Sequence, residues 1–180
     1  MSCEGTERAK VPTICVIGFG NPQRRDDGIG PYILSRLDAA FARTKAVRTI
    51  SCRQLVPELV EEIEMVDLLL LVDASAAQVA NGWEWREVEP DLGQWHFVTH
   101  QLTPSFFLGL ADALYKRHPM TWLISVQGED FDLGEGLSPA ATARAVRAAD
   151  EIVGFVEEWI SLRHGVVLAL RERLIQNLAG

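Results

Sequence analysis

Two patterns of apolar positions alternate along the chain and predict strands and helices in turn. Short apolar runs are typical of strands in a buried sheet, and apolar residues three or four positions apart indicate amphipathic helices. The predicted strands are 13–17, 46–52, 68–72, 83–89 and 121–126. The predicted helices are 31–42, 56–66, 103–117, a long one that begins at 138–139, and 166–178. The alternation predicts an α/β fold, a three-layer α/β/α sandwich with a mixed, mainly parallel sheet of about five strands.

The chain length and the apolar runs limit the domain organisation. With 180 residues, we expect a single domain whose core needs no metal or disulfide for stability. Its core should cover about 13–162, followed by a helical tail at 163–180. The N-terminal segment reads MSCEGTERAK and has no apolar stretch typical of a signal peptide. The longest aliphatic run, 68–72, is too short to cross a membrane. We therefore expect a cytoplasmic protein without membrane insertion.

Charge and cysteine content exclude further classes. The net charge of -8 at pH 7 argues against nucleic acid or an anionic membrane as the main partner. The three cysteines, Cys3, Cys15 and Cys52, form no CxxC pair, so neither a disulfide framework nor a cysteine zinc site is predicted.

The turn between the first predicted strand and the first helix is rich in glycine and charge. It reads GFGNPQRRDDGIGP and covers residues 18–31. In open α/β sheets such turns lie at the carboxyl ends of strands, where ligands bind. Position 23 is Gln where a dinucleotide-binding motif has its third glycine, and Asp26 and Asp27 would repel a pyrophosphate. The flanking Arg24 and Arg25 should face solvent, where they could hold a partner's carboxylate.

Three candidate site residues follow predicted strands or precede a helix. Asp27 follows the first strand, Asp73 ends the strand at 68–72, and His100 lies in a loop before a helix. We expect all three at the carboxyl edge of the sheet. Two carboxylates and one imidazole suit a divalent metal such as nickel, zinc or iron, and three ligands leave coordination positions open for catalysis.

Each candidate also has a structural interpretation. Asp26 or Asp27 could cap the first helix, Asp73 could be a turn residue, and His100 could be a solvated loop residue. The sequence alone does not choose between these interpretations and a site.

Four segments, in the same order along the chain, resemble those of a known family. They read GFGNPQRRDDGIGP, LLLLVDAS, THQLTP and SVQGEDFDLGEGLSPAATARAV, and the similar region spans roughly 14–156. The family is that of the hydrogenase maturation proteases. These endopeptidases remove the C-terminal extension from the large-subunit precursor of nickel–iron hydrogenases.

The resemblance implies a site and a mechanism. Asp27, Asp73 and His100 would contact a metal, and the first of these positions is Glu in some members of the family. The nickel would be supplied by the precursor, with no tightly bound cofactor in the protease itself. Since no Gly-x-Ser-x-Gly motif is present and no Ser or Cys nucleophile is evident, a carboxylate would activate water while the metal polarises the scissile carbonyl. A nickel-binding chaperone or checkpoint protein without peptidase activity would use the same residues. A hydrolase of a small substrate on the same fold would need a closed pocket.

Overall fold

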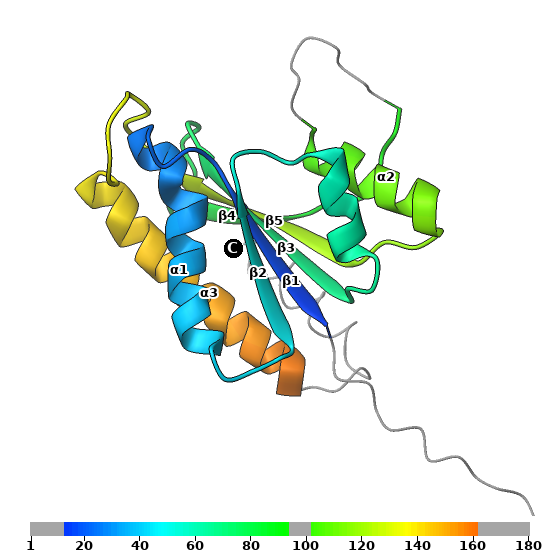
Figure 1. Ribbon diagram of the computed structural model, residues 1–180. Helices are drawn as coiled ribbons and strands as arrows, with labels where there is room; N and C mark the ends of the chain where they lie inside the picture. Colours follow the sequence, from blue (N-terminus) through cyan, green and yellow to red (C-terminus); the bar gives the residue numbers. More distant parts are fainter. Residues whose placement is uncertain (1–12, 94–101, 162–180) are drawn as a thin grey trace, which may run out of the picture.

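A twisted sheet lies at the centre of the computed structural model, which describes residues 13–93 and 102–161 (Figure 1). Within these residues the sheet has five strands in the order β2-β1-β3-β5-β4. All neighbours are parallel except β4, which is antiparallel to β5. The strands are β1 (Ile14–Phe19), β2 (Val47–Cys52), β3 (Leu68–Ser75), β4 (Trp83–Glu87) and β5 (Met120–Gln127). The predicted mixed, mainly parallel sheet is confirmed.

Helices cover both faces of this sheet. They are α1 (Ile29–Phe41), α2 (Pro104–Tyr115) and α3 (Pro139–Ser161), together with two 3-10 helices, η1 (Arg25–Gly28) and η2 (Pro57–Ile63). Helices α1 and α3 lie side by side on one face and α2 lies on the other (Figure 1). The α2 face also carries η2. The predicted α/β/α sandwich is therefore confirmed. No helix of the described part of the chain is both long and apolar enough to cross a membrane.

The central strand β3 is buried on both faces, which explains its continuous aliphatic run. Leu68, Leu70 and Val72 belong to the hydrophobic cluster under α1 and α3. Leu69 and Leu71 belong to the cluster under α2 and η2. Because side chains alternate between the faces of a strand, apolar residues at every position require a helix layer on each side.

Two helices differ from the sequence-based prediction in type or in starting residue. The helix predicted at 56–66 is the shorter 3-10 helix η2, with bonds between residues three apart, such as Glu64 N to Glu61 O. Apolar residues three or four positions apart fit a 3-10 helix as well, so the pattern did not separate the two. Helix α1 begins at Ile29 rather than 31, since a proline in the first turn loses no intrahelical bond. The helix predicted at 166–178 lies outside the described residues.

Two glycines let α1 begin directly against the ends of β1 and β3. A Cβ on Gly30 would lie 2.5 Å from the Phe19 O atom and 2.9 Å from the Val72 O atom. A Cβ on Gly18 would lie 2.7 Å from the Gly30 O atom. The backbones therefore touch where a larger residue would separate them. This contact holds η1, which precedes α1, over the carboxyl edge of the sheet.

Candidate functional site

Asp27 lies in η1 and is held by the turn that follows β1. Its Oδ2 atom accepts a hydrogen bond from the Asn21 backbone N–H at 2.8 Å. Gly20 adopts a φ of 133°, and a Cβ there would lie 1.9 Å from the Asp27 O atom, so this turn requires glycine. Helix α1 has no side-chain cap, and its N-cap residue is Gly28. The interpretation of Asp26 or Asp27 as the cap of this helix is therefore wrong.

Asp73 lies in the last part of β3, opposite Ser125 of β5, and is half-buried. Burial is the main cause that raises the pKa of its carboxyl from 3.8 to about 7. A hydrogen bond from the Ala74 backbone lowers this pKa, and the charge of nearby Asp27 raises it. The two carboxyl groups therefore lie close enough to interact at the same edge of the sheet. A group with a pKa near neutrality can both take up and release a proton at pH 7.

The third predicted residue, His100, lies outside the described residues. Within 13–93 and 102–161, no group of three or more His, Cys, Asp or Glu side chains is placed to hold a metal ion. The structure thus brings together two of the three predicted residues, Asp27 and Asp73. Their carboxylate oxygens are ligands of the kind that divalent cations accept.

Solved structures of hydrogenase maturation proteases have a similar fold. The structure of a NiFe hydrogenase maturation protease, HycI from Thermococcus kodakarensis, superposes with a TM-score of 0.63 at 27% sequence identity. The match covers 79% of this chain and 90% of that one. The hydrogenase maturating endopeptidase HybD from E. coli matches with a TM-score of 0.60 at 24% identity, over 81% of this chain and 93% of that one. The chain has the fold of the hydrogenase maturation proteases.

The similarity to this family, first inferred from four sequence segments, is confirmed by these structures. No protein-family model matches the chain, and no curated protein matches it in sequence. The similarity to the maturation proteases therefore depends on the three-dimensional arrangement and on short sequence motifs.

Asp26, the neighbour of Asp27, has a structural role that the sequence did not predict. Its side chain is fully buried and accepts hydrogen bonds from the backbone N–H groups of Glu129, Asp130 and Ser138 at 2.8, 3.0 and 2.6 Å. The Ser138 hydroxyl donates a fourth bond at 2.9 Å. Burial alone would raise the pKa of Asp26, but these bonds outweigh it and hold the pKa below its ordinary value. Asp26 thus anchors the loop between β5 and α3 beside Asp27.

The two arginines before Asp26 bind the same loop. Arg24 donates from Nε and Nη2 to the Phe131 carbonyl at 3.2 and 3.0 Å. Arg25 forms an ion pair with Asp130 at 3.1 Å. Both arginines are exposed as predicted, and they contact this loop of the same chain. Their binding of a partner's carboxylate stays a prediction.

Proposed function

We propose that this protein is an endopeptidase that removes the C-terminal extension of a nickel-loaded hydrogenase large-subunit precursor. The observation that carries the proposal is the Asp27–Asp73 pair at the carboxyl edge of a maturation-protease fold, with the pKa of Asp73 raised to about 7. We place this activity in the cytoplasm, with the precursor as the binding partner. Neither nucleic acid nor a membrane takes part in the proposed reaction.

The proposed reaction is hydrolysis of one peptide bond by water. A carboxylate of the pair accepts a proton as the water oxygen attacks the scissile carbonyl carbon. The C–N bond then breaks, and the proton passes to the departing amide nitrogen. The raised pKa of Asp73 supports this role, since the group can hold the proton between the two steps at neutral pH.

The nickel in this proposal belongs to the substrate. Asp27, Asp73 and His100 are the residues that we assign to contact it, and that contact would position the precursor and polarise its carbonyl. The carboxylate oxygens of Asp27 and Asp73 fit a divalent ion. In this assignment, the carboxylates of Asp27 and Asp73 together act as metal ligand and as general base. A protease that recognises its substrate through the bound nickel would not cleave a nickel-free precursor.

The test is an incubation of the protein with the precursor, prepared with and without nickel, followed by mass spectrometry of the products. We expect loss of the C-terminal peptide from the loaded form alone. Asp27→Asn and Asp73→Asn should prevent cleavage. Asp150→Asn, an exposed aspartate on α3, serves as the matched control and should cleave normally. Cleavage of the nickel-free form at the same rate would refute metal recognition. A bound but uncut precursor would instead indicate a checkpoint protein.

A further inference from the structure

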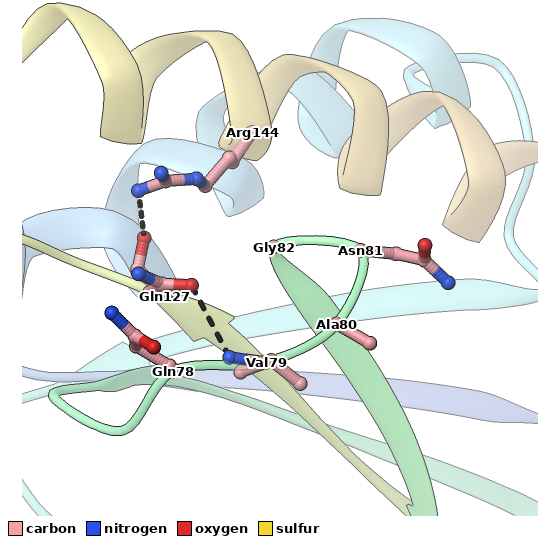
Figure 2. A pocket seen from close by; sticks show the side chains of 7 residues that line it. All are labelled: Gln78, Val79, Ala80, Asn81, Gly82, Gln127 and Arg144. Carbon is pink, nitrogen blue, oxygen red and sulfur yellow. Dashed lines mark hydrogen bonds between the residues drawn. The ribbon is translucent and has the colours of Figure 1, made fainter.

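A polar cavity of about 650 Å³ lies at the carboxyl end of β5, the strand next to β3 (Figure 2). The loop before β4 forms one wall, and the last residue of β5 and one side chain of α3 form the other (Figure 2). The lining residues are Gln78, Val79, Ala80, Asn81, Gly82, Gln127 and Arg144. Its volume lies within the range of about 300–1,000 Å³ that ligand sites occupy.

The cavity is close to the site along the sheet. Gln127, which lines it, is paired with Ser75, and Ser75 is two residues beyond Asp73 on β3. Two residues of a strand span about 7 Å. Asp73 shares the α2 face with Leu71, whereas Arg144 comes from α3 on the other face. An extended peptide covers about 3.3–3.6 Å per residue, so a chain that passes from Asp73 over the carboxyl edge of the sheet needs at least about two to three residues to reach the cavity.

Hydrogen bonds fix the shape of the cavity. The Val79 N–H donates to the Gln127 Oε1 atom at 3.2 Å, and the Gln127 N–H donates to the Gly82 O atom at 2.8 Å. Arg144 donates from Nη1 to the Gln127 O atom at 3.2 Å. Gly82 has a φ of 83°, and a Cβ there would lie 2.9 Å from the Arg144 Cδ atom. The loop therefore passes close to α3 at a position that requires glycine.

The chemistry of the lining favours a neutral polar ligand. Arg144 is the one ionisable residue among the lining residues, and its charge is paired with Glu129 at 2.8 Å. The other polar side chains are the carboxamides of Gln78, Asn81 and Gln127. A carboxamide both donates and accepts hydrogen bonds, as a peptide main chain does. A phosphate or another strong anion would compete with Glu129 for the only cation.

We propose that this cavity binds an extended, uncharged segment of the precursor next to the scissile bond, through its main-chain amides. This inference rests on the proposed endopeptidase function. The segment lies either before the bond, in the body of the precursor, or after it, in the extension. The two sources present the same main-chain chemistry.

The test fills the cavity and measures steady-state cleavage of the loaded precursor. Ala80→Trp places a large side chain at an exposed lining position, and Ala143→Trp makes the same change at an exposed position of α3 outside the lining. We expect Ala80→Trp to raise KM about tenfold with kcat within about twofold, because it removes substrate binding and leaves the chemistry intact. Ala143→Trp should match the wild type. Gln78→Trp, at another exposed lining position, is the second variant if Ala80→Trp does not fold.

The outcomes separate this inference from the function on which it rests. If the wild type cleaves and both lining variants keep its KM, or lose kcat alone, the cavity is not a substrate site and the proposed function stands. If the wild type does not cleave the loaded precursor, both proposals fall. A precursor whose extension is cut to a single residue then locates the bound segment. Loss of the KM difference places the segment after the bond, and a persistent difference places it before the bond.

Discussion

Replacing Asp73 by asparagine should stabilise the protein above neutral pH and abolish cleavage. In the folded protein, burial and the charge of Asp27 raise the pKa of the Asp73 carboxyl to about 7, whereas its ordinary value is 3.8. Between these two values the folded state holds a proton that the unfolded chain releases. The free energy of unfolding therefore decreases as the pH rises from about 4 to above 7. Asparagine is neutral throughout and removes this dependence.

The size of the effect follows from the two pKa values. The difference between 3.8 and about 7 corresponds to about 4 kcal/mol, at about 1.36 kcal/mol per pH unit. Asp73 is only half-buried, so water screens part of its charge, and we expect Asp73→Asn to raise the free energy of unfolding by about 1–3 kcal/mol at pH 8. For a chain of this size, that corresponds to a rise in Tm of about 2–12 °C.

The measurement is urea unfolding of the wild type and Asp73→Asn between pH 4 and pH 8, with a chelator present to remove free metal. The difference between the two proteins should be small near pH 4 and largest at pH 8. Asp150→Asn, with an exposed carboxyl, should show no such growth with pH. A difference between wild type and Asp73→Asn that is the same at every pH, or a less stable Asp73→Asn at pH 8, would refute the reasoning.

Three further predictions concern the surroundings of the site. Asp26→Asn should lower the free energy of unfolding by about 3 kcal/mol at pH 7 in urea titrations, because one amide oxygen cannot accept the four bonds of the buried carboxylate. Gly20→Ala should displace Asp27 and lower the rate of cleavage, since its Cβ would meet the Asp27 carbonyl oxygen. The control Gly154→Ala, in an open position of α3, should raise the free energy of unfolding by about 0.5–1 kcal/mol and cleave normally. His100→Ala should lose cleavage of the loaded precursor with its Tm retained, and a normal rate would exclude His100 from the site.

The sheet and the place of Asp73 could be predicted because both depend on local patterns. The run at 68–72 is apolar at every position, which requires cover on both faces, and such strands end at the edge where sites form. The bond type of η2 could not be read in the same way, since its apolar spacing is common to two kinds of helix. The cavity could not be predicted either, because its polar lining comes from a loop, a strand end and a helix that share no periodic pattern in the sequence.

The different roles of Asp26 and Asp27 show why some features of the site could not be predicted. The two residues are identical in kind and adjacent, so no local pattern distinguishes them. Their difference depends on partners more than 100 residues away, where the loop after β5 encloses one carboxylate and leaves the other beside Asp73. The same loop continues to the cavity, since Glu129 donates its N–H to Asp26 and pairs its carboxylate with Arg144. A single residue thus connects the wall of the cavity to the turn that carries Asp27, and loss of the Asp26 bonds would loosen both at once.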